Sequence, residues 1–345
     1  MKKAIKFLLI SVIVVLASVV NAQPAARNTY KFLTLPTSPR VAAMGGDFVG
    51  AWDHDINFAI ANPALINPEL NRQMSLNMVN YFSGISYGSA SYGNTFNKLG
   101  SFVGTVKYID YGSFTHTNDI GETLGTFQAG ETALIIGWGR QLDSVFSIGA
   151  NIKAINSSLE TYNSFGFAVD VAGMMRLQNG LSVTVIASNI GRQLTSFSGI
   201  NEPLPFNLQV GLSNRLQHLP FRYSILFTHL HQWDLTYHDP ARTKRDPFTG
   251  EIVEEDKFST ILDGVMRHVV VGGELMPVRN IAIRFGYNYR LRQETQVDSR
   301  ISTVGFSWGF GIKVHRFHFN YARKAFHLHG SPNYVSISTN LSEFF

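Results

Sequence analysis

The sequence predicts an all-β protein: a 14-stranded antiparallel transmembrane β-barrel with an N-terminal lumen plug. Three observations predict it. The chain begins like an exported protein, apolar and polar residues alternate with a period of two through most of its length, and an aromatic residue, Phe345, ends the last predicted strand. A terminal strand that closes on an aromatic carboxy terminus is typical of bacterial outer-membrane barrels.

Residues 1–22 form a predicted secretory signal peptide. A basic start with three lysines precedes an apolar run over residues 7–20, and Val20-Asn21-Ala22 is a small-residue cleavage site. A membrane-anchoring helix is the alternative, but the 14 positions of the apolar run fall short of the roughly 20 that span a bilayer. Removal of the signal lowers the formal charge from +5 to +2, so the charge gives no indication of nucleic-acid binding.

The composition of the mature chain favours a barrel. Cysteine is absent, which excludes disulfides and cysteine-ligated metals. Hydrophobic residues make up 45% of the chain and charged residues 15%, yet no stretch after residue 22 approaches 18 consecutive apolar residues. A closed barrel is the sheet structure that a bilayer tolerates, because hydrocarbon offers no partner for an open edge. A soluble sandwich would show the same alternation with its faces reversed; the signal peptide and Phe345 favour the barrel.

Residues 23–73 precede the first predicted strand and form the predicted plug. Five prolines make this segment unsuitable for regular barrel strands. Its apolar residues need a partner, and a barrel of this size encloses space that side chains of the wall do not fill. We therefore expect it to fold into the lumen around the plug motif Asn62, Pro63 and Ala64. A disordered linker or a periplasmic segment is the alternative.

Residues 74–345 form the predicted outer-membrane β-barrel. Fourteen runs of about ten residues are bounded by turn residues: 74–82, 84–96, 101–110, 131–141, 145–157, 164–177, 181–189, 206–216, 221–231, 266–276, 280–291, 301–314, 316–326 and 333–345. An even count places both termini on the periplasmic side, with short periplasmic turns and longer outer loops. Short and long connections alternate as this requires, except between the first two strands.

Several residue groups suggest chemistry, and each has a simpler explanation. The histidine pairs His229/His231, His315/His318 and His327/His329 could bind metal, but no third ligand is evident. Asp53-His54-Asp55 and the group Asp234, His238 and Asp239 could activate water, yet Asp53 and Asp55 suit turn caps in the plug. Gly84, Gly88 and Gly93 suit barrel curvature. We predict no catalytic residue, no metal site and no cofactor, and therefore no enzyme.

The connection over residues 232–265 is the predicted partner-contact loop. Loops longer than about 15 residues are usually functional or disordered, and aromatic and arginine side chains anchor interfaces. The candidate contact residues are Trp233, Tyr237, Arg242, Lys244, Arg245 and Phe248.

Ordered motifs along the chain carry a family resemblance. Leu35 to Gly46, with the sequence LPTSPRVAAMGG, is followed by Asp53-His54-Asp55 and then Asn62-Pro63-Ala64. This region resembles the amino-terminal part of the long-chain fatty-acid transporter (FadL-like) superfamily. Together with the YIDYGSF segment at 108–114, GRQLDS at 139–144 and EPLPF at 202–206, the chain resembles the PorQ family of type IX secretion system outer-membrane proteins of the Bacteroidota from about residue 30 to its end.

The resemblance implies a non-enzymatic outer-membrane barrel of the type IX attachment complex. Its implied partners are a sortase-like protease, a shuttle barrel and a lipopolysaccharide-recognising surface protein that this barrel tethers, so that cargo signal domains are cleaved and cargo is attached to lipopolysaccharide. The alternative is a FadL-like channel for hydrophobic small molecules, which would need an apolar pocket and a lateral opening. An outer-membrane enzyme is the third and least favoured class.

Overall fold

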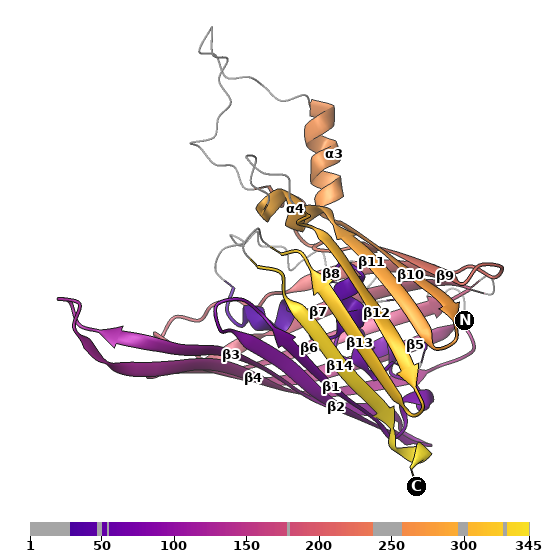
Figure 1. Cartoon of the computed structure of the whole chain (residues 1–345), viewed down its shortest axis with the longest axis horizontal. Coiled ribbons are helices and arrows are strands. Elements are labelled where there is room, and N and C mark those ends of the chain that lie inside the picture. The colour runs from indigo at the N-terminus through magenta and orange to yellow at the C-terminus, as the bar shows by residue number, and fades with distance from the viewer. Residues whose placement is uncertain are drawn as a thin grey trace, which may run out of the picture.

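A computed structural model describes residues 28–46, 50–53, 55–177, 180–236, 257–295, 303–326 and 330–344. Fourteen antiparallel strands close into one barrel around the N-terminal segment (Figure 1), as the sequence predicts. The strands are β1 (Gln73–Asn80), β2 (Ser86–Phe96), β3 (Gly100–Thr117), β4 (Thr123–Gln141), β5 (Phe146–Leu159), β6 (Tyr162–Arg176), β7 (Leu181–Thr195), β8 (Asn207–Arg215), β9 (Phe221–Phe227), β10 (Val269–Val278), β11 (Ile281–Asn288), β12 (Phe306–Val314), β13 (Phe317–Lys324) and β14 (Asn333–Asn340).

The last strand closes the ring on the first. The β1–β14 register runs without a break from Gln73 opposite Asn340 to Asn80 opposite Asn333. Just beyond it, the Leu341 amide donates a hydrogen bond to the Arg72 carbonyl at 2.9 Å. The start of β1 and the end of β14 therefore lie at one end of the barrel, which we call the short-turn end, and the opposite end is the long-loop end.

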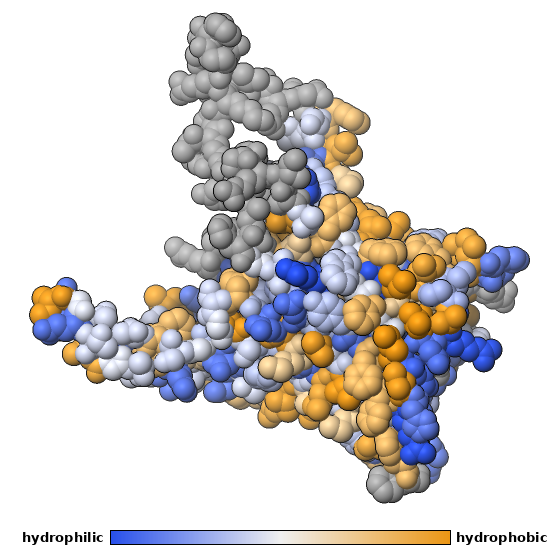
Figure 2. Space-filling model, in the orientation of Figure 1, coloured by the Kyte–Doolittle hydropathy of each residue, from blue (hydrophilic) through white to orange (hydrophobic). Residues whose placement is uncertain are grey.

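The two faces of the wall have the sense that a membrane barrel requires. In β11, Arg284 points into the lumen and is 5% exposed, whereas its neighbour Phe285 points outward and is 47% exposed. The same alternation gives β1 an outer row of Met74, Leu76 and Met78. Figure 2 shows apolar side chains gathered over the strands that face the viewer. Apolar side chains outside and polar ones inside exclude the sandwich alternative, in which the apolar face is buried.

The long-loop end differs most from the predicted boundaries. The predicted loop over residues 111–130 is largely strand: β3 and β4 continue past the wall as a long hairpin, where Phe114 stacks on Phe127 with ring centroids 5.3 Å apart. Pairing continues into that hairpin despite register shifts after Asp110 and after His116. Likewise β5 and β6 leave only residues 160–161 between them.

Two helices stand where the sequence predicts loop and strand. The first, α3 (Lys257–Arg267), lies within the predicted contact loop, and the second, α4 (Tyr289–Thr295), replaces the end of a predicted strand. In α3, Phe258, Ile261 and Leu262 follow the helical spacing of i, i+3 and i+4. At the other terminus, β14 stops at Asn340, whose side chain caps the 3-10 helix η6 (Leu341–Glu343). No helix within the described ranges is long and apolar enough to cross a membrane.

The plug consists of short helices packed inside the barrel. They are η1 (Lys31–Thr34), α2 (Pro39–Ala43), η2 (Ile56–Phe58), η3 (Pro63–Leu65) and η4 (Pro68–Leu70). Proline opens three of them, where its missing amide costs no hydrogen bond. The prolines that argue against strands therefore start helical turns. Their apolar side chains form three buried clusters with the wall.

Wall glycines admit the plug backbone. A Cβ atom at Gly149 of β5 would overlap the Pro63 carbonyl, and one at Gly286 of β11 would overlap the Gly45 amide. Gly93, which we expected to ease barrel curvature, faces the plug: a Cβ atom there would overlap the Leu70 carbonyl in the same way. The plug thus touches the wall without intervening side chains.

Candidate functional site

Two cavities lie in the lumen, at opposite ends of the plug. The short-turn cavity has a volume of about 480 Å³ and is lined by Arg40, Asp53, Glu274 and the end of β14. The long-loop cavity has a volume of about 310 Å³ and is lined by residues 33–38 of the plug together with Lys107, Asn189 and Tyr334.

A buried ionic cluster joins the plug to the wall beside the short-turn cavity. Its members are Arg40, Asp53, Asp55, Arg222, Glu274 and Arg284, and we call it the latch cluster. Glu274 of β10, 1% exposed, accepts two hydrogen bonds from the Arg40 guanidinium at 2.9 and 2.8 Å. Arg222 of β9 and Arg284 of β11 each add one at 2.8 Å. Charge-assisted bonds of this kind are short and directional, so they fix α2 against three strands.

The plug supplies the remaining carboxylates. Arg40 lies 2.7 Å from Asp53 and 3.2 Å from Asp55. Burial alone would raise the pKa of Asp53, but the Arg40 and Arg222 guanidinium groups lower it below its ordinary value. Asp53 also accepts the Asp55 amide, and Asp55 accepts the Asn57 amide at the start of η2. The predicted turn caps are confirmed. Their ion pairs were not predicted, and His54 lies outside the described residues.

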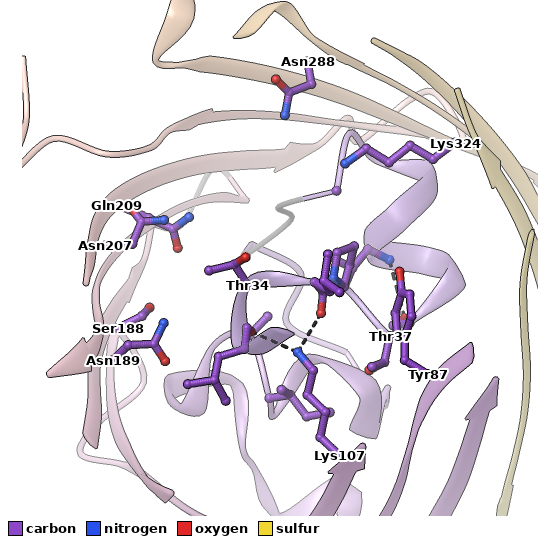
Figure 3. A pocket seen from close by; sticks show the side chains of 18 of the residues that line it. Thr34, Thr37, Tyr87, Lys107, Ser188, Asn189, Asn207, Gln209, Asn288 and Lys324 are labelled. Atoms are coloured by element: carbon purple, nitrogen blue, oxygen red, sulfur yellow. Dashed lines mark hydrogen bonds between the residues drawn. The ribbon is translucent and has the colours of Figure 1, made fainter. Parts of the chain in front are cut away.

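Lys107 of β3 lies at the wall of the long-loop cavity. Its ammonium donates to the carbonyls of Leu33 at 3.0 Å and Leu35 at 2.7 Å, and so ties η1 to the wall (Figure 3). Two strands away, Lys153 of β5 pairs with Asp170 at 2.7 Å and donates to Asn189. Amide and hydroxyl groups, rather than an apolar surface, line the facing wall in Figure 3.

The pairing of β6 with β7 contains two register shifts, and the one at Asp170 borders this cavity. The β6–β7 register shifts between Val169 and Val171. Asp170, at the shift, accepts the Asn189 amide at 2.8 Å as well as the Lys153 ammonium. Side-chain hydrogen bonds of Asp170 therefore close the wall at this register shift, where interrupted strand pairing could otherwise create a lateral opening.

The predicted plug motif lies inside the plug. The Asn62 side chain accepts the Ala64 amide at 3.0 Å and caps η3, and Pro63 is the residue that meets Gly149. The role of this motif beyond packing stays a prediction.

Of the predicted contact residues, Trp233 is described. It is 69% exposed and stacks on His268 with ring centroids 5.7 Å apart. Tyr237, Arg242, Lys244, Arg245 and Phe248 lie outside the described residues, as do Phe345 and the signal peptide. Partner contact by this loop stays a prediction.

Within the described residues, no group of three His, Asp or Glu side chains has an arrangement that could hold a metal ion. The imidazole rings of His229 and His231 lie near each other, with ring centroids 6.0 Å apart. Burial lowers the pKa of His229 to about 2, with help from Arg290, so this ring is neutral at physiological pH. His327 and His329 lie outside the described residues.

Exposed apolar residues mark two projections at the long-loop end. Phe258 and Ile261 of α3 are 72% and 65% exposed, and Ile120 and Leu124 lie exposed at the tip of the β3–β4 hairpin. Figure 1 shows both projections standing clear of the barrel. The sequence-based prediction places these apolar residues in irregular loops and therefore does not single them out.

Solved structures share this fold at low sequence identity. The Pseudomonas putida toluene transporter TodX matches with a TM-score of 0.52 and 12% identity over 88% of this chain and 96% of that chain. The deltaS2 mutant of the TodX monoaromatic hydrocarbon channel matches with a TM-score of 0.51 and 13% identity over 88% and 97%. A Pseudomonas aeruginosa FadL homologue matches with a TM-score of 0.48 and 11% identity over 88% and 98%. No family model and no curated protein matches the chain.

Proposed function

We propose that this chain is a non-enzymatic outer-membrane β-barrel of a Gram-negative bacterium, closed by its plug, whose long-loop end docks partner proteins. The observation that carries the proposal is the latch cluster: a plug fixed to three strands by buried ion pairs suits a scaffold better than a conduit. Breaking such a pair by removing one partner typically costs about 3–5 kcal/mol.

The outer surface supports the placement in a membrane. Rows of exposed apolar side chains follow most wall strands, β1, β11 and β12 among them, and bilayer hydrocarbon is the environment in which that arrangement is stable. Such barrels have short periplasmic turns and longer outer loops. By that rule, the short-turn end with both termini of the barrel faces the periplasm, and α3 and the β3–β4 hairpin face outward.

The partners that we propose are those of the type IX attachment complex. The motifs at 35–46, 62–64, 108–114 and 202–206 support this assignment through their resemblance to the PorQ family. In this proposal the barrel tethers a surface protein that recognises lipopolysaccharide, beside a sortase-like protease and a shuttle barrel. The exposed apolar stripe of α3 and Trp233 supply a contact surface of the kind that interfaces use.

Co-purification from native membranes in mild detergent tests the proposal. We expect a sortase-like protease and a large surface protein in the eluate of the wild-type barrel. Phe258→Ser, Ile261→Ser and Leu262→Ser combined should release the surface protein while heat-modifiable mobility on gels shows a folded barrel.

Ile120→Ser with Leu124→Ser is the matched control, because it removes exposed apolar residues from the other projection. Retention of partners by the α3 variant and their loss from the hairpin variant would move the docking surface to the hairpin. An eluate that holds no partner protein with the wild type contradicts the proposal.

A channel for hydrophobic small molecules is the second candidate, favoured by the fold shared with TodX. Wild-type-dependent uptake of toluene into cells, or a hydrocarbon bound in the purified barrel, would support it. Charged side chains line both cavities alongside apolar ones, and this argues against it, since ligand sites for hydrophobic molecules are mostly apolar.

A further inference from the structure

Basic side chains outnumber acidic ones among the described residues that line the long-loop cavity. The charged side chains that line it are Lys107, Lys153, Lys324, Arg290, Asp170 and Glu294. Each carboxylate already has a basic neighbour: Asp170 lies 2.7 Å from Lys153, and Glu294 lies 3.5 Å from Arg290. The neutral His229 ring adds no charge.

Lys107 is the most deeply buried member of this basic lining and is 2% exposed. Its ammonium is bonded to two backbone carbonyls, of Leu33 and Leu35, and no ion pair joins it to a carboxylate of the described residues. An ammonium has three donors, so one remains for a third acceptor. Burial of a charge without a counter-charge is costly. An anion that entered the cavity would supply the counter-charge that the protein itself does not place there.

The opposite wall offers hydrogen bonds to a polar ligand. Ser188, Asn189, Asn207 and Gln209 stand together on that wall (Figure 3). Gln209 donates from Nε2 to the Thr228 hydroxyl, while its Oε1 takes part in no hydrogen bond among the described residues. An acceptor facing a cavity, across from a cation, matches a ligand that carries hydroxyl groups as well as a negative charge.

We propose that the long-loop cavity binds an anionic sugar of monosaccharide size, with the carboxylate or phosphate on Lys107 and the hydroxyl groups on the amides opposite. The volume of about 310 Å³ lies at the small end of ligand sites. The sugar is either free or the end residue of a cell-surface polysaccharide. This inference goes beyond partner docking and is independent of it.

Calorimetric titration of the full-length barrel in detergent tests the site, with glucuronate as probe and glucose as the neutral control. We expect glucuronate to bind and glucose not to bind. An oligosaccharide with a terminal glucuronate distinguishes the two sources: binding equal to or tighter than that of the monosaccharide assigns the site to a polysaccharide end, and weaker binding assigns it to a free sugar.

Lys107→Gln removes the charge yet keeps donors for the Leu33 and Leu35 carbonyls. It should weaken glucuronate binding about tenfold or more, as expected for loss of a charged hydrogen bond. Lys313→Met, which removes a lysine from the short-turn cavity, is the matched control and should bind as the wild type does. If Lys107→Gln misfolds, Gln209→Glu is the second variant, because a carboxylate in the cavity should repel the anion to a similar degree.

Three results would overturn the inference. The first is wild-type protein that binds neither anionic probe at millimolar concentration. The second is binding of glucose as tight as that of glucuronate, which would leave Lys107 without a role. The third is equal loss of binding in Lys313→Met and Lys107→Gln, which would place any bound anion elsewhere.

Discussion

The two lumen cavities differ in how their buried charges are balanced. In the short-turn cavity the central carboxylate, Glu274, meets three guanidinium groups, and Arg40 in turn meets two further carboxylates. In the long-loop cavity the Lys107 ammonium donates to two backbone carbonyls and forms no ion pair with a carboxylate of the described residues. Paired buried charges hold the plug against the wall, whereas an ammonium without a carboxylate partner can accept a ligand of opposite charge. In our proposal the same plug is therefore fixed at one end and lines a ligand site at the other.

Removal of the central carboxylate of the latch cluster should have the largest effect on how firmly the plug is held. Glu274→Gln leaves three buried guanidinium groups around a neutral amide, which should destabilise the plug by about 3–5 kcal/mol. We expect a lower unfolding midpoint and a rise in single-channel conductance in planar bilayers as the plug loosens. Glu343→Gln, at an exposed site lining the same cavity, is the control. Unchanged conductance and midpoint in Glu274→Gln would show that the latch cluster does not hold the plug.

Crowding the plug backbone should have the next largest effect. A methyl group at Gly149 would overlap the Pro63 carbonyl, whereas one at Gly173 of the neighbouring strand meets nothing within 4 Å. Overpacking of a well-packed site typically costs about 1–3 kcal/mol. Gly149→Ala should therefore lower the unfolding midpoint measured by gel mobility, and Gly173→Ala should not. Equal midpoints would mean that the plug does not press on the wall at η3.

Acid should weaken the latch cluster and leave the Lys107 tether unchanged. The folded pKa of Asp53 is depressed below its ordinary value of 3.8, so its contribution to stability is complete above that pH and is lost as the pH falls below it. We expect the wild-type midpoint to fall as the pH is lowered below about 4. Asp53→Asn should flatten that dependence, and Asp119→Asn on the hairpin should retain it. A profile that Asp53→Asn leaves unaltered would remove Asp53 from the latch.

The smallest effect should come from the plug motif. Asn62→Ala removes the cap of η3 at the Ala64 amide, a change that typically costs about 1 kcal/mol. Asn62→Ser keeps an acceptor at this position and should restore part of the midpoint. Identical midpoints for both variants would indicate that the cap contributes nothing measurable.

The barrel could be predicted because its alternation is local, and the latch could not because its residues are distant. Ile283 and Phe285 share one face in any strand, but their burial depends on what surrounds the sheet. Arg40 and Glu274 are 234 positions apart, and nothing near either one indicates the other. Arg284 on the polar face of its strand was the available signal. The helix α3 was missed because its apolar spacing lies among the charged residues of a long connection.

The seam between β1 and β14 has a consequence for the order of folding. Among the strand pairs of the ring it joins the residues farthest apart in sequence, so its closure carries the largest loop entropy and is expected to be slow. The plug is covalently continuous with β1 and touches β5, β10 and β11. Each of those contacts shortens the loop that remains to be closed. We therefore expect the plug to bring the wall strands together before β1 pairs with β14.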